Sequence, residues 1–290
     1  MRIGAVFPQT EIGDDPAAIR DWAQAVEEIG YHHVLAYDHV LGAGVATRPD
    51  WQGYTSETAF HEVFVLFGYL AAVTSTVELV TGVLVLPQRQ TALVAKQAAE
   101  VDVLSGGRLR LGIGVGWNRV EYDALGEDFT NRGVRSEEQV GVLRALWAEP
   151  TITYAGRWHR VDNAGIKPRP VRHRIPVWFG GNSEAALRRT GRIGDGWFPQ
   201  RAPDEEAAAM LNRIRGYAKD AGRAPETIGF EPRLSLAQVP EAERSDFVAG
   251  WRDLGATHLC VNTMGLGLAT PDNHVATLRD TYQALEPVLR

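Results

Sequence analysis

Cysteine is almost absent from this chain of 290 residues, which contains only Cys260. One cysteine cannot form a disulfide within the chain, so a disulfide scaffold is excluded and a reducing compartment is favoured. Cys260 lies in the apolar run 257–261, which predicts a buried thiol without a chemical role. Lysine is also scarce, and we expect Lys96, Lys167 and Lys219 on helix or loop surfaces. Schiff-base chemistry, which requires a lysine in an apolar pocket, is therefore disfavoured.

Long hydrophobic runs are missing as well. The longest uncharged apolar stretch, 63–73, has 11 residues, whereas a bilayer span needs about 20. The first residues form an apolar strand with no signal-type segment, so we predict a cytoplasmic protein with no membrane contact. The formal net charge of −6 argues against a nucleic-acid partner, since such proteins usually carry a basic domain.

The pattern of elements predicts an α/β fold. Short apolar runs alternate with segments of helical periodicity, as in βα units that build a parallel sheet. We expect eight strands, at 2–7, 32–37, 77–86, 109–113, 177–179, 197–198, 228–236 and 257–261. Eight such units in 290 residues favour a single-domain (β/α)8 TIM barrel over residues 1–290, with insertions at a long loop, 42–55, and a hairpin, 151–161.

Candidate functional residues follow the predicted strands, where such barrels carry their chemistry. Asp38-His39 ends the second strand, and this pair either tunes a proton or forms a plain turn. Thr81-Gly82-Val83 interrupts a β-branched strand, as a bulge or a close approach to a ligand does. The run 112–117 has the spacing Gly-x-Gly-x-Gly with Trp117 next, so it fits a glycine-lined rim better than a dinucleotide fingerprint.

The segment Gly180-Gly181-Asn182-Ser183 follows the fifth strand and opens a helix. Free backbone N–H groups at a helix N-terminus bind anions, so a phosphate site is predicted here. The alternative is that Asn182 or Ser183 only caps the helix. Neither a helical zinc motif around His61 nor a Gly-x-Ser-x-Gly elbow is present, and no metal site is predicted.

Several of these segments together resemble the bacterial luciferase-like superfamily, in particular its coenzyme F420-dependent oxidoreductases. The similarity is carried, in this order, by 80–87, 95–99, 104–108, 112–117, 180–183 and 194–197. The resemblance implies a (β/α)8 barrel, a non-prolyl cis peptide at Gly82-Val83, and a homodimer. It implies that the site consists of Asp38, His39, Thr81, Gly82, Val83, Gly114, Val115, Gly116, Gly180, Gly181, Asn182 and Ser183.

The resemblance also implies roles. Asp38 and His39 would meet the deazaflavin ring or the substrate, with His39 held by Asp38 as the group that stabilises or delivers a proton. Residues 114–116 would line the ring and ribityl region, and 180–183 would hold the phosphate. The pair Asp38-His39 favours coenzyme F420, where flavin-using members often have Glu-His, and FMN is the alternative cofactor.

The expected activity is hydride transfer between F420 and a small organic substrate. An FMN-dependent monooxygenase and a non-catalytic cofactor-binding barrel are the alternatives. Sugar-phosphate dehydrogenases of this branch carry a tryptophan where this chain has Gly42 to Gly44, and a catalytic glutamate where it has Trp117. A sugar phosphate is therefore disfavoured, and Trp117 is expected to form an apolar wall.

We expect 42–55 and 154–176 to shape the substrate pocket. The apolar helices 60–73 and 91–104 either pack on the barrel or form a dimer interface.

Overall fold

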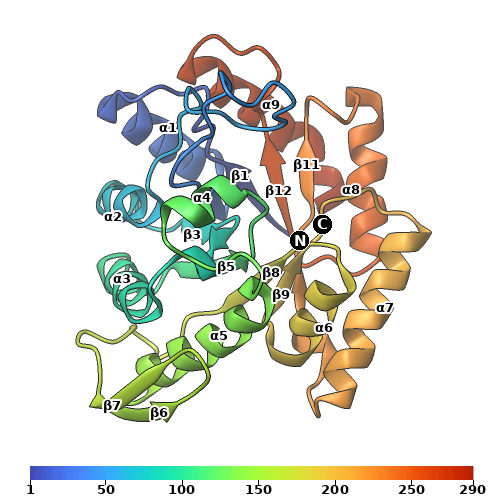
Figure 1. The fold of residues 1–290 in the computed structure, drawn as a ribbon. Coiled ribbons are helices and arrows are strands. Elements are labelled where there is room, and N and C mark those ends of the chain that lie inside the picture. Colours follow the sequence, from blue (N-terminus) through green and yellow to red (C-terminus); the bar gives the residue numbers. More distant parts are fainter. Residues whose placement is uncertain (290) are drawn as a thin grey trace.

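The computed structural model describes residues 1–289, and its centre is one curled sheet in which every strand pairing is parallel (Figure 1). The strand order is β10-β9-β8-β5-β3-β2-β1-β12-β11, and β4 pairs with β5. The strands are β1 (Arg2–Val6), β2 (His33–Ala36), β3 (Glu78–Thr81), β4 (Leu84–Val85), β5 (Leu109–Gly114), β8 (Val177–Gly180), β9 (Gly196–Phe198), β10 (Gly229–Phe230), β11 (Arg233–Ser235) and β12 (His258–Asn262).

The two ends of this strand order are neighbours in the sequence. Only Glu231 and Pro232 separate β10, which pairs with β9, from β11, which pairs with β12. The single strand predicted over 228–236 is therefore two short strands. Proline has no backbone N–H to donate, so a break in the ladder at Pro232 is expected. The result is a barrel-like α/β fold, as the alternation of elements predicts.

Helices surround the sheet (Figure 1). They are α1 (Pro16–Ile29), α2 (Val63–Val73), α3 (Thr91–Leu104), α4 (Arg119–Ala124), α5 (Arg132–Ala148), α6 (Glu184–Ile193), α7 (Glu205–Asp220), α8 (Arg244–Asp253) and α9 (Pro271–Leu289), with short 3-10 turns at Leu86–Gln88, Pro225–Thr227 and Glu241–Glu243. Among residues 1–289, none of the helices combines the length and the apolar character that crossing a membrane requires.

Local sequence signals explain where α1 begins and ends. The Asp15 side chain accepts a hydrogen bond from the backbone N–H of Ala17 at 3.0 Å, and Pro16 occupies the first turn. Gly30 ends the helix with φ of 106°, a left-handed conformation that favours glycine. By contrast, the helical periodicity of the sequence predicts a helix over 136–147, whereas α5 begins four residues earlier, at Arg132.

The hairpin pairs β6 (Ile152–Ala155) with β7 (Arg160–Ala164) in an antiparallel ladder, as predicted. It lies against α5, where the Glu138 carboxylate accepts hydrogen bonds from the backbone N–H groups of Arg157, Trp158 and His159 at 2.9 Å. Figure 1 shows the hairpin at the outer edge of the molecule, away from β11 and β12. The hairpin is thus an addition to the outside of the fold.

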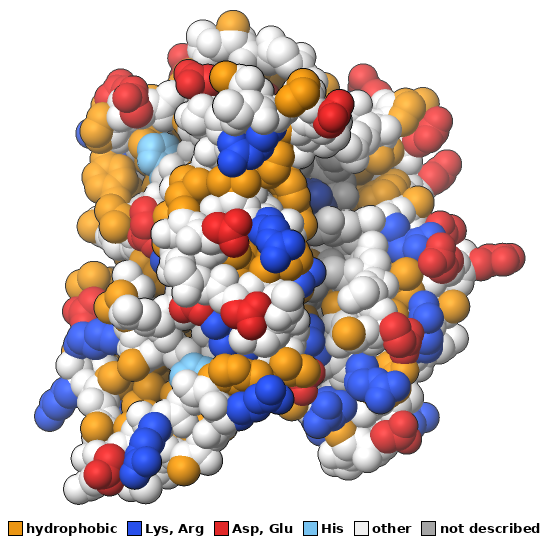
Figure 2. Space-filling view, in the orientation of Figure 1, with side chains coloured by type: hydrophobic (Ala, Val, Ile, Leu, Met, Phe, Trp, Pro, Cys, Tyr) orange, Lys and Arg blue, Asp and Glu red, His pale blue; other side chains and the backbone are white. Residues whose placement is uncertain are grey.

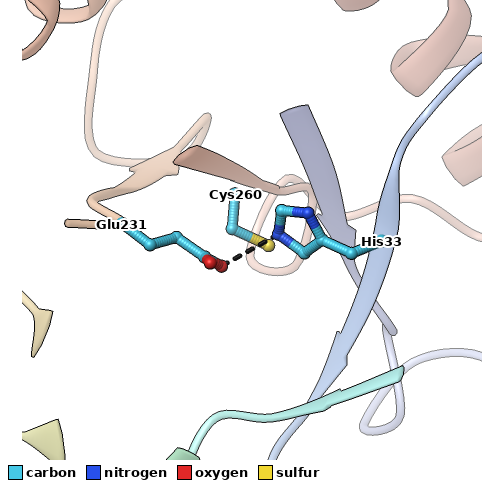
Figure 3. A group of neighbouring side chains, drawn as sticks. All are labelled: His33, Glu231 and Cys260. Carbon is cyan, nitrogen blue, oxygen red and sulfur yellow. Dashed lines mark hydrogen bonds and ion pairs between the residues drawn. The ribbon is translucent and has the colours of Figure 1, made fainter. Parts of the chain in front are cut away.

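The inside of the curl is divided into an apolar layer and a charged layer. The apolar cluster consists of Val6, Leu35, Val80, Trp178, Phe198 and Cys260, all buried, which confirms the predicted burial of Cys260. Toward the starts of the strands, Arg110 pairs with Glu231 at 2.5 Å and with Glu78 at 3.0 Å. The other Glu231 oxygen lies 2.9 Å from Nε2 of His33 (Figure 3). These opposite charges compensate one another away from water.

Figure 3 shows that His33 of β2, Cys260 of β12 and Glu231, from the link between β10 and β11, converge inside the sheet. One potential ligand atom from each lies within 4.8 Å of the others. The guanidinium of Arg110 already provides a cation at Glu231, and it also lies 4.3 Å from the Trp178 ring centre. We therefore describe this group as the ionic part of the barrel interior.

Candidate active site

The predicted site residues gather at one edge of the sheet. Because all strands are parallel, their carboxyl ends meet at the same edge. Asp38 and His39 follow β2, and Gly82 and Val83 follow β3. At that edge, too, β5 ends in the segment 114–116, and β8 ends in 180–183. The topology thus places four segments from distant parts of the sequence beside one shared space.

Val83 occupies the middle of this edge. The Gly82–Val83 peptide is cis, as the resemblance implied. A Cβ at Gly114 would lie 2.5 Å from Cγ2 of Val83, and one at Gly180 would lie 2.9 Å from Cγ1. These glycines are therefore required by the close approach of the Val83 side chain. Thr81 is fully buried and donates its hydroxyl to the carbonyl oxygen of Gly112 at 2.6 Å, so it supports the strand and does not face the open space.

A cavity of about 310 Å³ lies between the ends of β5 and β8. Its lining includes five of the predicted residues, namely Gly114, Val115, Gly180, Gly181 and Ser183, together with Arg132, Ser136 and Arg189. Of the seven residues predicted in 114–116 and 180–183, the other two lie outside this lining. Gly116 turns away toward Val85, and Asn182 donates its side-chain amide to the carbonyl oxygen of Gln200 at 3.4 Å. We call this space the glycine cavity.

The charges around the glycine cavity suit an anion. The N-terminus of α6 opens onto it, and Ser183 caps this helix by accepting from the N–H of Ala186 at 3.3 Å. Among the residues of the 1–289 range, Arg132 has no acidic partner and donates instead to the carbonyl oxygen of Phe129 at 2.7 Å. Arg189 lies 3.4 Å from Glu137, a weak ion pair. A bound phosphate would meet a helix N-terminus and an uncompensated guanidinium.

Asp38 does not hold His39, which corrects the expectation from the resemblance. Its carboxylate accepts from the backbone N–H of Val85 at 3.0 Å and from Nη2 of Arg89 at 2.7 Å. Only 2% of Asp38 is exposed. The side chain therefore ties the end of β2 to the end of β4, two residues beyond Val83, and it positions this segment without facing the open edge.

His39 has Glu121 as its partner. Nδ1 of His39 lies 3.3 Å from Oε2 of Glu121, and the ring stacks on Tyr54 with a centroid distance of 3.8 Å. Glu121 also accepts from the Tyr54 hydroxyl at 2.7 Å and from the N–H of Val40 at 2.8 Å. The His39 side chain remains 18% exposed while that of Glu121 is 1% exposed. His39 is thus the accessible end of a hydrogen-bonded group.

Electrostatics keep Glu121 ionised. Burial alone would raise the pKa of this carboxyl, but the hydrogen bonds from His39, Tyr54 and Val40 outweigh it and lower the pKa to about 2. Burial and the neighbouring carboxylate both raise the pKa of the Tyr54 hydroxyl, which therefore stays protonated. Asn118 donates to the same hydroxyl oxygen at 2.8 Å. The arrangement is a neutral tyrosine and a charged carboxylate, both linked to His39.

Aromatic rings cover this group. Trp51 and Trp117 lie 5.7 Å apart between ring centres, and Tyr54 lies 5.4 Å from Trp117. Trp117 is half exposed, so part of its ring is open to solvent. The loop 42–55 reaches the candidate site through Trp51 and Tyr54, and its role in shaping a substrate pocket stays a prediction. The segment 154–176 does not reach this site, because it lines neither the glycine cavity nor the larger cavity at the ends of β9 and β11.

The larger cavity, of about 810 Å³, opens at the ends of β9 and β11. Gln200, Arg201, Arg233, Ser235 and Gln238 line it together with apolar side chains such as Val239 and Phe247. Figure 2 shows a hollow between the surface over α4 and the surface over α8, with Lys or Arg side chains visible inside it. We call this space the β11 cavity. Arg233 donates to the Tyr37 hydroxyl at 3.0 Å, and Tyr37 precedes Asp38, so the β11 cavity adjoins the site.

Among the residues of the site that the sequence did not reveal, three show why. Glu121 stands three residues after Asn118, and this spacing is typical of a helix cap, which hides its role. Tyr54 lies in a loop without regular periodicity, and Arg233 lies in a strand whose inward face cannot be identified from so short a segment. Contacts between distant segments, not local patterns, reveal all three.

Fold and site together define an α/β protein with a curled parallel sheet, whose strand ends surround a glycine-lined cavity. The sequence profile of the luciferase-like monooxygenase family matches residues 1–286. The chain therefore belongs to this family of oxidoreductases and monooxygenases, and it is an enzyme.

Individual relatives point to more than one cofactor. The chain is 33% identical over 274 residues to an FMNH2-dependent dimethylsulfone monooxygenase of Pseudomonas fluorescens (strain Pf0-1), covering 92% of this chain and 71% of the relative. Its fold is similar to that of an F420-dependent secondary alcohol dehydrogenase in complex with an F420-acetone adduct. That match has a TM-score of 0.81 and 18% identity, and it covers 100% of this chain and 99% of the other. The monooxygenase RslO1 of Streptomyces bottropensis matches with a TM-score of 0.79 and 20% identity over 100% of both chains.

Proposed function

We propose that this enzyme is an F420-dependent oxidoreductase that transfers a hydride between the deazaflavin and a small organic substrate. The glycine cavity carries the proposal, because it combines a helix N-terminus, Ser183 and Arg132, whose hydrogen bonds go to neutral carbonyl oxygens, with a glycine wall. These residues fit the phosphate end of an elongated cofactor. The preference for F420 rests on Asp38-His39, the pair found in the sequence, and on the resemblance to F420-using enzymes.

The residues of this chain have separable roles in the proposal. Ser183, Gly181 and Arg132 bind the phosphate, and Val83 supports the ring from the sheet side. Asp38 and Arg89 keep the bend that carries Val83 in place. The cofactor supplies the hydride acceptor or donor when bound. His39, held by Glu121, stabilises or delivers a proton beside the ring, and the covering rings of Trp51 and Trp117 restrict water.

FMN is the second candidate, favoured by the 33% identity to an FMNH2-dependent monooxygenase. In that case reduced flavin and oxygen would be consumed together. The same glycine cavity would hold the FMN phosphate, so the two candidates differ in cofactor and in the requirement for oxygen.

Paired titrations of the purified protein with F420 and with FMN, followed by tryptophan fluorescence, test the proposal. Micromolar or tighter binding of F420 alone supports it. A preference for FMN would overturn it and favour the FMN-dependent monooxygenase. The matched variant is His39→Ala. We expect a loss of turnover of about 10²-fold or more with the cofactor Kd nearly unchanged. Unchanged turnover would refute the role of His39.

Three further features belong to the proposal. The sheet would be a closed (β/α)8 barrel, because β10 and β11 stand at the two ends of the strand order and are two residues apart. A homodimer would use α2 and α3, where Val65 and Leu93 are 72% and 52% exposed. Sedimentation showing only the 31.8 kDa species at micromolar concentration would refute the dimer. The cytoplasmic location stays a prediction from the lone cysteine.

A further inference from the structure

The β11 cavity contains a cation without an anionic partner. Arg233 is half-buried, and its only polar contact within residues 1–289 is the neutral hydroxyl of Tyr37 at 3.0 Å, with the Tyr37 ring 5.4 Å from the guanidinium carbon. Glu231, two residues earlier in the link between β10 and β11, is already paired with Arg110 and His33. A half-buried guanidinium with free N–H groups has a strong tendency to bind an anion.

Other charged groups in the β11 cavity are arranged differently. Arg201 forms ion pairs with Asp204 and Glu206, both at 2.8 Å, so its charge is compensated. Glu243 and Asp246 line the cavity near α8, but both are exposed, and neither lies within ion-pair distance of Arg233. Water screens exposed carboxylates, so the inner part of the cavity is positive and the outer part is not.

Neutral donors and apolar side chains complete the cavity. Gln200, Gln238 and Ser235 offer side-chain donors beside Arg233, and Ala202, Val239 and Phe247 offer an apolar surface. Its volume of about 810 Å³ exceeds the 310 Å³ of the glycine cavity, which has its own cation in Arg132. The two cavities therefore offer two separate sites for anionic groups.

We propose that the β11 cavity binds the substrate and that this substrate is an organic acid, whose anionic group is held by Arg233 while its apolar part lies against Val239 and Phe247. Binding of an organic anion follows from the cavity itself, and only the identification of this anion as the substrate rests on the proposed function. Tyr37 connects Arg233 to Asp38, so a molecule held there lies beside the candidate active site.

The test uses octanoate and octan-1-ol as probes on the purified protein, by isothermal titration calorimetry at low and at physiological salt. We expect octanoate to bind more tightly than the alcohol, with an affinity that falls as salt rises. Arg233→Gln should weaken octanoate binding by roughly tenfold or more, the size expected for a charge-assisted hydrogen bond, and should leave the alcohol unaffected. Arg201→Gln, in the same cavity, should change octanoate binding by less than about threefold, as expected for a screened, compensated charge.

Arg233→Lys keeps the charge and separates a binding role from a structural one. It should retain most of the affinity for octanoate if the cation binds the anion. If Arg233→Gln does not fold, the octanoate affinity of Arg233→Lys and the salt dependence of octanoate binding to the wild type decide whether Arg233 binds the anion. Equal binding of octanoate and octan-1-ol, or no salt dependence, overturns the proposal, as does unchanged octanoate binding in a folded Arg233→Gln.

Cofactor titrations separate the sources of the anion. If Arg233→Gln weakens F420 or FMN binding and leaves octanoate binding intact, the β11 cavity belongs to the cofactor and the inference is wrong. If neither cofactor binds the wild type but octanoate binding still depends on Arg233, the proposed function fails. The organic-acid site then stands by itself.

Discussion

Replacing Glu121 by glutamine tests the electrostatic design of the candidate site. The Glu121 carboxylate is buried and accepts hydrogen bonds from the Tyr54 hydroxyl at 2.7 Å and from the Val40 N–H at 2.8 Å. Its Oε2 also faces Nδ1 of His39. Glutamine has nearly the same shape but no charge, and its amide group would turn two hydrogens toward groups that already donate. The variant therefore removes the charge and leaves the packing.

The magnitude follows from the pKa. A carboxyl whose pKa falls from 4.5 in the unfolded chain to about 2 in the folded protein contributes about 3 kcal/mol to the free energy of unfolding. Because the folded pKa is the lower one, this contribution is complete above about pH 4.5. It declines as the pH falls toward 2. The linkage between proton binding and folding predicts that the contribution of Glu121 to the free energy of unfolding falls by about 2 kcal/mol between pH 7 and pH 3.

Urea unfolding of the wild type and of Glu121→Gln at several pH values measures this directly. We expect the free energy of unfolding of the variant to be about 3 kcal/mol lower than that of the wild type at pH 7. This difference between the two proteins should be about 2 kcal/mol smaller at pH 3. Glu226→Gln, at an exposed position, is the control and should stay within about 0.5 kcal/mol of the wild type. A difference in the free energy of unfolding that is small at pH 7, or that does not change with pH, would refute the reasoning.

Two further substitutions test the interior and the glycine cavity. Glu231→Gln should lower the free energy of unfolding by about 3 kcal/mol or more at pH 7, since Arg110 then lacks its closest anion inside the barrel, and urea unfolding would reveal it. Gly114→Ala places a Cβ 2.5 Å from Val83 and should weaken cofactor binding by about tenfold, because the required shift of a close-packed side chain costs about 1–3 kcal/mol. Gly216→Ala, where a Cβ meets nothing within 4 Å, is its control and should leave the cofactor Kd unchanged. Equal Kd values for both alanine variants would show that Val83 does not shape the cofactor site.

Local sequence signals predicted much of the fold. The cap residues Asp15 and Gly30 define the two ends of α1, and the boundaries of α3, Thr91–Leu104, agree with the predicted ones. The alternation of strands and helices predicted the parallel sheet, and the order of glycine motifs predicted which strand ends form the site. These features depend on neighbours in the sequence and on backbone preferences, which a single sequence contains.

Contacts across the fold explain what the sequence could not predict. The pair Asp38-His39 suggested that one side chain holds the other. In the structure, Asp38 instead pairs with Arg89, and His39 pairs with Glu121. Both partners come from other elements, 51 and 82 residues further along the chain. A long side chain on a short helix such as α4 has no periodicity that would reveal its direction.

By itself, then, the sequence determined the class of fold, the position of the glycine motifs at the strand ends and the burial of Cys260. The tertiary structure alone decided which charges meet. It paired Glu121 with His39, compensated Glu231 with Arg110, and left Arg233 facing the β11 cavity without an anionic partner among residues 1–289. Secondary structure follows short-range backbone and side-chain preferences, whereas the ionisation and reach of a polar side chain depend on groups that only the folded chain brings within a few ångströms.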